Sequence, residues 1–230
     1  MNLLALETST ETGSVAWLED GRCVAEIVFR RKNSHSEVLA NALQDVAALA
    51  GHTLAEAEAL ALSGGPGSYT GLRIGASTAK GLCAGLGIPL YPIDTLAALA
   101  WAASAHARLL GGVLIAPMLD ARRMEVYTAL YREDGTCLRP SAPVILDESF
   151  LEDDAEDGPI LTVGNGVPKL IDLLAHTGRF VFLPEAEPLA RAVGELAYLE
   201  MQLRQPPADL IRYEPNYLKP FMGTKPKAQV

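Results

Sequence analysis

The residues with the clearest chemical potential form a glycine-rich stretch, 63–75, with the sequence Ser-Gly-Gly-Pro-Gly-Ser-Tyr-Thr-Gly-Leu-Arg-Ile-Gly. Glycine adopts positive φ freely and lets a ligand or another backbone come close. An apolar run, 59–62, leads into the stretch and a small-residue helical pattern leads out of it, so free N–H groups at the helix start would suit a phosphate. The alternative is a tight turn that packs this helix on its own sheet. These residues alone favour the turn, because the stretch lacks the Lys-Ser/Thr ending of a P-loop.

A second set of polar residues follows an apolar run in each half of the chain. Glu7 ends the run 3–7 and precedes Thr8 and Ser9, while Asp120 follows the run 113–119. Carboxylate oxygens suit a hard cation, and hydroxyl and backbone N–H groups can hold phosphate. An acid at the end of the first strand of each half also resembles the actin-like ATPase superfamily, and this resemblance implies a vestigial nucleotide site at Glu7, Thr8, Ser9 and Asp120. The alternative is that Thr8 is an ordinary turn residue and that Asp120 caps a bend.

The other chemistry-bearing residues predict neither a metal site nor a nucleophile. No two of the four histidines lie four apart on a predicted helix, and none has a cysteine at ligand spacing. His35 falls at a helix start, where a surface role is expected. Ser68 follows glycine, but the stretch is not a GxSxG motif, and serine is a common N-cap residue. We therefore predict no metal and no catalytic residue.

Composition limits the compartment and the partners. The 230-residue chain has a net charge of −9, which argues against strong autonomous nucleic-acid binding, since that usually needs a basic footprint. The three cysteines, Cys23, Cys83 and Cys137, are far apart and odd in number, which suits a reducing compartment. The sequence shows no signal-peptide pattern and no apolar stretch long enough to span a bilayer. We therefore expect a cytoplasmic protein that does not enter a membrane.

The elements that position these residues repeat along the chain. In the first half we predict strands at 3–7, 14–19, 22–29, 59–62 and 88–92, with helices at 36–50, 70–86 and 95–106. The second half repeats this order, with strands at 113–119, 124–131, 160–163 and 179–183, another after the 133–135 turn, and helices at 166–176 and 188–203. The sequence Glu-Asp-Gly-Arg-Cys at 19–23 also matches Glu-Asp-Gly-Thr-Cys at 133–137. The pattern predicts an α/β protein of two β-β-β-α-β-α-β subdomains, 1–108 and 109–205, and a tail, 206–230, that packs back in part.

Two helices of the first half carry more apolar surface than one sheet contact needs. Glycine inside a helix costs about 1 kcal/mol relative to alanine, which is tolerable where both sides pack closely. The surplus predicts an interface with another subunit, and the alternative is that both are core helices of a three-layer α/β fold. The residues predicted for the interface are His35, Leu39, Ala42, Leu43, Val46, Leu72, Gly75, Ala76, Ala79, Lys80 and Cys83.

Several motifs in register resemble one known family. The central motif is 65–75 with its continuation at 79–81, and further matches occur at 4–10, 34–37, 120–127 and 213–218. Together they span nearly the whole chain and resemble the TsaB (YeaZ) family of bacterial tRNA threonylcarbamoyladenosine biosynthesis proteins. The resemblance implies a duplicated actin-like ATPase fold of the ASKHA, ribonuclease H-like class. It also implies a role in placing a threonylcarbamoyl group on N6 of adenosine 37 in ANN-decoding tRNAs.

The resemblance further implies a non-catalytic subunit, a pseudoenzyme that acts as a scaffold or activator. The related catalytic subunit, TsaD, carries a metal-binding helix with histidines four apart, whereas here Leu39 lies four residues after His35. The implied partners are a TsaD-like catalytic subunit and a TsaE-like ATPase, with a homodimer when the chain is alone. The resemblance implies that tRNA is reached only through the complex.

The resemblance implies no intrinsic cofactor. It leaves open whether a nucleotide binds at the interface with the catalytic partner. Glu7 stands where the family commonly has aspartate, which weakens the case for direct magnesium contact. The alternative function is that of an autonomous ATPase or phosphotransferase of the actin-like superfamily.

Overall fold

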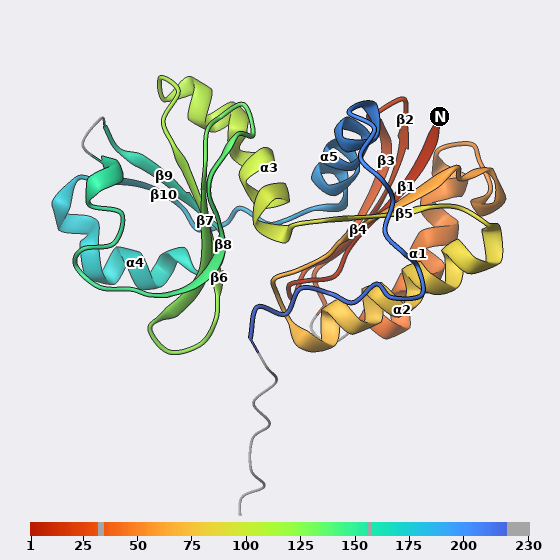
Figure 1. The fold of residues 1–230 in the computed structure, drawn as a ribbon, viewed down its shortest axis with the longest axis horizontal. Coiled ribbons are helices and arrows are strands. Elements are labelled where there is room, and N and C mark those ends of the chain that lie inside the picture. The colour runs from red at the N-terminus through yellow and green to blue at the C-terminus, as the bar shows by residue number, and fades with distance from the viewer. Residues whose placement is uncertain (32–34, 156–157, 220–230) are drawn as a thin grey trace, which may run out of the picture.

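The computed structural model describes residues 1–31, 35–155 and 158–219, and its strands form two five-stranded sheets (Figure 1). The first sheet has the strand order β3-β2-β1-β4-β5, with β1 antiparallel to β2 and parallel to β4. Its strands are β1 (Asn2–Glu7), β2 (Gly13–Glu19), β3 (Arg22–Phe29), β4 (Ala59–Ser63) and β5 (Leu90–Ile93). The turn between β2 and β3 has both residues at positive φ, 47° for Asp20 and 79° for Gly21, as a two-residue hairpin requires.

The second sheet repeats the topology of the first. Its strand order is β10-β9-β6-β7-β8, with β6 antiparallel to β7 and parallel to β9. Its strands are β6 (Ile115–Asp120), β7 (Glu125–Tyr131), β8 (Cys137–Ile145), β9 (Ile160–Val163) and β10 (Phe180–Leu183). The matching strand order confirms that the fold is duplicated.

The interior of the central strand β1, residues 3–6, is apolar because helices cover both faces of the sheet. Leu4 and Leu6 pack in one core with α1 (His35–Leu49) and α2 (Tyr69–Leu86). Leu3 and Ala5 belong to a separate core with α5 (Ala190–Gln202). Successive side chains of a strand point to opposite faces, so a strand between two helical layers needs an apolar residue at every position.

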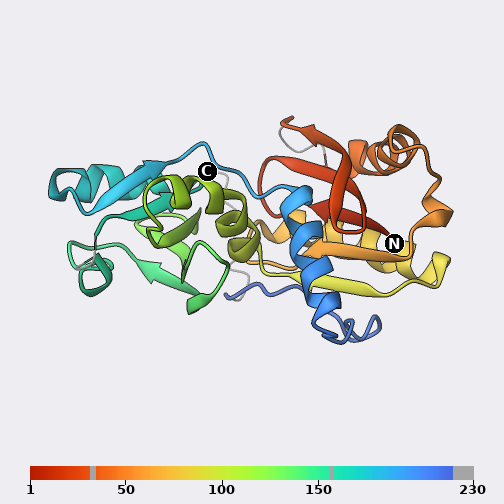
Figure 2. The ribbon, with the colours of Figure 1, turned by 90° about the horizontal axis from the view of Figure 1, so that it is seen from above.

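The two halves exchange a helix. α3 (Thr95–Leu109) packs its Leu96 and Leu99 side chains into a core with β6, β7 and β9 of the second sheet. α5, which comes late in the chain, packs on the first sheet. Both views place α3 and α5 together between the sheets (Figures 1 and 2), and Trp101 Nε1 of α3 donates to Glu195 Oε2 of α5 at 2.8 Å. The predicted subdomain boundaries at residues 108 and 205 follow the order of the chain. In space, however, α3 of the first subdomain packs on the second sheet, and α5 of the second subdomain packs on the first sheet.

The remaining helices differ from the predicted bounds at their ends. α5 begins at Ala190 rather than at Pro188, because Leu189 is extended, with a ψ of 151°. α4 (Val167–Leu174) covers the outer face of the second sheet and continues as a 3₁₀ turn, Ala175–Thr177, which overlaps the end of the predicted helix. Two further 3₁₀ turns are Leu54–Glu56 and Asp153–Ala155. The predicted capping box at the start of α1 involves Ser34, which lies outside the described residues.

The chain returns to the first half after α5. Residues 206–219, called the C-terminal strap below, run along β5 and α2, and Ala208 N donates to Leu90 O at 2.9 Å. Lys80 Nζ of α2 donates to the carbonyl oxygens of Ile211 and Tyr213, both at 3.2 Å. Residues 220–230 lie outside the described part of the chain. Among the described residues, none of the helices has the length and apolar character needed to cross a membrane.

Candidate functional site

The turn between β1 and β2 holds three of the four residues predicted for a nucleotide site. Glu7, Thr8 and Ser9 are all at most 1% exposed. Glu7 Oε1 accepts from Ser9 N at 2.5 Å, and Glu7 Oε2 has no hydrogen-bond partner among the described residues. Burial raises the pKa of the Glu7 carboxyl to about 7. These side chains therefore lie inside the protein and do not line a surface site.

The glycine-rich loop and α2 close this turn by direct packing. A Cβ on Gly67 would lie 2.4 Å from Ser9 O, and one on Gly71 would lie 2.0 Å from Thr8 O. A Cβ on Gly75 would lie 2.3 Å from Thr8 Oγ1. Real Cβ atoms do not approach other atoms so closely, so the glycines are required by packing against Thr8 and Ser9. The loop is thus a tight strand-to-helix joint, which was the alternative that the residues alone favoured.

Asp120, the fourth predicted residue, has a different environment. It is exposed, and its Oδ1 accepts from Lys169 Nζ at 2.5 Å and from Arg122 N at 2.7 Å. Its own backbone N–H donates to Asn165 Oδ1 at 2.8 Å. The structure therefore does not unite Asp120 with Glu7, Thr8 and Ser9 in one accessible site, because packing encloses the three residues of the first turn.

A pocket of about 320 Å³ lies between the two halves of the molecule. Its polar lining includes Thr10 and Thr12 of the β1–β2 turn and Asn165 of the β9–α4 connection, and the segment before α5 also contributes to it. Glu187, in the same pocket, accepts from Arg30 Nε at 2.9 Å and from the Thr12 hydroxyl. Its charged lining residues are Glu11, Arg30, Glu185 and Glu187. Carboxylates outnumber the single arginine, so the lining is unfavourable for the phosphates of a nucleotide.

The interface residues predicted on α1 and α2 are largely covered within this chain. Ten of them are buried, and most belong to the core between these helices and the sheet. They are His35, Leu39, Ala42, Leu43, Val46, Leu72, Gly75, Ala76, Ala79 and Cys83. The eleventh, Lys80, is bound to the C-terminal strap. The apolar stripe faces the sheet because that is where apolar area is removed from water.

The opposite face of α1 and α2 is exposed and rich in small residues. Its members are Ala40, Asn41, Gln44, Ala48, Leu49, Ser77, Gly81, Ala84 and Gly85. A Cβ added to Gly81 or Gly85 would meet no atom of another element within 4 Å. We call this set the outer helical face. Nothing within the described chain explains its two glycines.

His35, at the start of α1, does not have the surface position that was predicted for it. His35 is 6% exposed rather than on the surface, because its ring packs edge-on against Phe29, with centroids 5.6 Å apart. Burial lowers the pKa of this imidazole. Among the described residues, no group of three His, Cys, Asp or Glu side chains is arranged to hold a metal ion.

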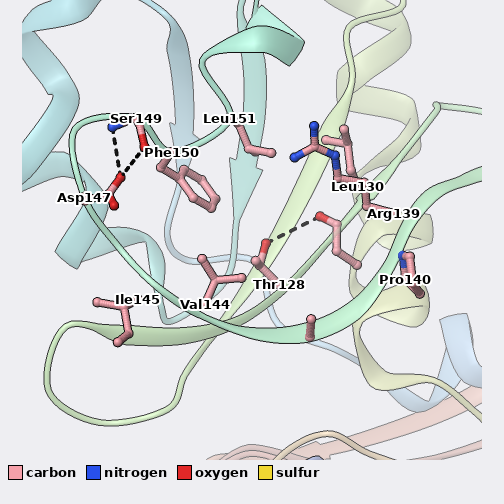
Figure 3. A pocket seen from close by; sticks show the side chains of 12 residues that line it. Thr128, Leu130, Arg139, Pro140, Val144, Ile145, Asp147, Ser149, Phe150 and Leu151 are labelled. Carbon is pink, nitrogen blue, oxygen red and sulfur yellow. Dashed lines mark hydrogen bonds between the residues drawn. The ribbon is translucent and has the colours of Figure 1, made fainter.

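A second pocket, of about 290 Å³, lies on the second sheet beneath the connection that follows β8 (Figure 3). Its lining is mainly apolar and includes Leu130, Val144 and Phe150. Asp147 Oδ1 accepts from both the backbone N and the Oγ of Ser149, which fixes the connection. It contains none of the residues predicted for a site.

The sequence analysis missed the contacts of the strap and of the β6–β7 connection. Tyr217 of the strap packs on Tyr69 of α2, with ring centroids 4.9 Å apart. Lys219 pairs with Glu125 of β7. The matches at 120–127 and 213–218 marked both segments, but only the fold brings them together.

Comparisons with known proteins all lead to tRNA threonylcarbamoyladenosine biosynthesis. The family model described as tRNA N6-adenosine threonylcarbamoyltransferase, TsaD, matches residues 23–186. The TsaB protein of Bacillus subtilis is 31% identical over 95% of this chain and 94% of its own length. The TsaB protein of Escherichia coli is 33% identical over 81% of this chain and 83% of its own.

The fold agrees as well. The solved structure of YeaZ from Pseudomonas aeruginosa superposes with a TM-score of 0.80 at 28% identity, covering 94% of this chain and 99% of that chain. This match and the duplicated sheets confirm the predicted actin-like fold. The chain belongs to the TsaB (YeaZ) family of tRNA threonylcarbamoyladenosine biosynthesis proteins.

Proposed function

We propose that this chain is a non-catalytic subunit in tRNA threonylcarbamoyladenosine biosynthesis, acting as a scaffold or activator of a TsaD-like catalytic subunit together with a TsaE-like ATPase. The observation that carries the proposal is the filled β1–β2 turn, where Gly71 and Gly75 pack directly on Thr8. A phosphate at that turn would need the space that α2 occupies. The proposal includes no intrinsic cofactor.

The outer helical face is the surface proposed to meet the partner. A glycine inside a helix costs about 1 kcal/mol relative to alanine, and no other element of the described chain packs against Gly81, inside α2, or against Gly85, in its last turn. Glycine and alanine let two helices approach closely, so a second subunit on this face would offset the cost. The occupant is the TsaD-like subunit in the complex, and a second copy of this chain when it is alone.

The test replaces a small residue of this face by a bulky charged one. Ala84→Arg should prevent both homodimer and heterodimer formation, because the guanidinium would hold the helices apart. Ala102→Arg, on the exposed side of α3, is the matched control. Size-exclusion chromatography with light scattering, with and without the catalytic subunit, measures both states. A full-strength heterodimer with Ala84→Arg would overturn the proposed surface.

The alternative of an autonomous ATPase rests on the pocket between the halves. Its Thr10, Thr12 and Asn165 side chains offer polar groups at the position expected for a nucleotide in an actin-like fold. Titration calorimetry of the purified chain with Mg-ATP distinguishes the autonomous ATPase from the non-catalytic subunit. We expect no binding heat, because of the excess of carboxylates, and micromolar binding would favour the alternative.

A further inference from the structure

We propose that this chain directly contacts the sugar–phosphate backbone of tRNA through a basic surface where α2, the C-terminal strap and the β6–β7 connection meet. The inference rests on the proposed function, because it takes tRNA as the RNA bound by the complex. The surface, called the basic rim below, consists of Tyr69, Arg73, Arg122, Arg123, Tyr217 and Lys219.

Side-chain contacts link α2 to the strap and the strap to β7, which follows the β6–β7 connection. Tyr69 of α2 and Tyr217 of the strap pack with their ring centroids 4.9 Å apart. Two residues later, Lys219 pairs with Glu125 and lies 5.8 Å from the ring centroid of Tyr127. Figure 1 shows the strap ending between the start of α2 and the second sheet. The rim therefore spans both halves of the molecule.

Arg73 is held in place without being neutralised. Its guanidinium lies 5.5 Å from the centroid of the Tyr69 ring, and the residue is exposed. No carboxylate pairs with it in the described part of the chain. A guanidinium stacked on an aromatic ring keeps its planar set of donors available, and it loses less rotamer freedom on binding than a free one.

Arg122 and Arg123 occupy an unusual backbone conformation. Their φ angles are 72° and 50°, and both side chains are exposed. Asp120 Oδ1 fixes the turn by accepting from Arg122 N at 2.7 Å, and Ala121 N donates to Glu125 O at 3.1 Å. Two successive non-glycine residues with positive φ carry strain, which persists where the surroundings enforce it and often marks a functional site.

The basic rim keeps a positive charge because two of the carboxylates near it are paired with lysines. Asp120 is paired with Lys169 at 2.5 Å, and Glu125 is paired with Lys219. Glu214 is the exposed carboxylate that remains close to Tyr217. This surface contrasts with the net charge of −9 for the whole chain, which keeps RNA binding by the isolated chain weak.

The arrangement fits a polymer of phosphates better than a single nucleotide. The guanidinium groups come from two segments, Arg73 from α2 and the pair Arg122 and Arg123 from the β6–β7 connection, and neither pocket described above includes them. Arginine binds phosphate oxygens through paired N–H donors, so spaced arginines suit successive phosphodiesters. Within the assembled complex, the rim adds these contacts to those of the other subunits.

The test uses the assembled complex with the double variant Arg122→Asn/Arg123→Asn. Asparagine tolerates positive φ, so the turn is retained while two charges are removed. The matched control is Arg204→Asn, since Arg204 also has a positive φ, 58°, is exposed, and follows α5 outside the rim. The dissociation constant for unmodified tRNA is measured by filter binding over a series of salt concentrations, with Mg-ATP as a separate ligand.

We expect the double variant to bind tRNA about tenfold more weakly, and the salt slope to fall by about 1.4–1.8 for two lost phosphate contacts. Adding Arg73→Gln to the double variant should weaken tRNA binding further. The control Arg204→Asn should change neither the tRNA affinity nor the salt slope. KM for tRNA should rise while kcat stays unchanged, because the rim positions RNA and performs no chemistry.

Three results would overturn the inference. The first is unchanged tRNA affinity and salt slope in a complex that assembles and modifies tRNA normally, which leaves the proposed function intact. The second is loss of assembly in the double variant, which would make the rim a protein contact. The third is loss of Mg-ATP binding with unchanged tRNA binding. If the unmutated chain forms no complex with the catalytic subunit, both the proposed function and this inference fail.

Discussion

The hydroxyl of Thr8 donates a hydrogen bond to the carbonyl oxygen of Gly71 at 2.9 Å, which ties the β1–β2 turn to the first turn of α2. Because Thr8 is fully buried, this bond is shielded from water and joins two segments far apart in sequence. It shows how the glycine-rich stretch functions here: the loop brings a helix onto the turn and leaves no room for a ligand.

Gly71→Ala should destabilise the fold by about 1–3 kcal/mol, because the added Cβ would meet Thr8 O and one backbone would have to move. Gly81→Ala, in the same helix but facing open space, should instead stabilise it by about 1 kcal/mol. Chemical denaturation of both variants measures the difference. Equal effects would mean that Gly71 is not packed as described.

Glu7→Gln should reduce the pH dependence of stability in the acid range. Burial raises the pKa of Glu7 from 4.5 to about 7, so between these values the native state holds a proton that the unfolded chain has lost. The free energy of unfolding should therefore fall by roughly 3 kcal/mol as pH rises through this window and stay constant above it. Glutamine imitates the protonated form, so the variant should lack this decline. Urea titrations from pH 4 upward test it, and an identical pH profile for both proteins would contradict the assignment.

Lys80→Met should loosen the C-terminal strap. Methionine keeps an apolar stem of similar length but loses the two hydrogen bonds to the carbonyl oxygens of Ile211 and Tyr213. We expect cleavage within residues 206–219 to be several times faster in limited proteolysis. Ser77→Ala, on the exposed side of the same helix, serves as the control and should be cleaved at the original rate. Unchanged protection in the lysine variant would show that the strap is held by other contacts.

His52 should titrate above its ordinary pKa. Glu56 and Glu19 each lie 3.1 Å from one of its ring nitrogens and raise the pKa of the imidazole, which stacks on Trp17. A raised pKa means that the stability from this charge is fully present below 6.5 and is lost as pH rises through the folded value. An NMR titration measures the pKa, and Glu56→Gln should lower it. A pKa at or below 6.5 in the unmutated protein would be incompatible with both contacts.

The sequence by itself determined the elements and the family. Alternation and apolar runs placed the strands of both halves to within a few residues, and the Asp20-Gly21 pair located the hairpin, because turn chemistry and side-chain period are local properties. The repeated order of elements was sufficient to predict the duplication.

Tertiary structure alone decided which surfaces are accessible and which distant segments meet. The small-residue stripe of α2 predicted an interface, but Gly75 and Ala76 face the core, because a periodic pattern marks a helix face without saying what covers it. Likewise, no local signal shows that Lys80 binds the strap or that α3 and α5 exchange sheets. Such contacts depend on how the chain returns across its own surface, and that is set by the packing of the whole fold.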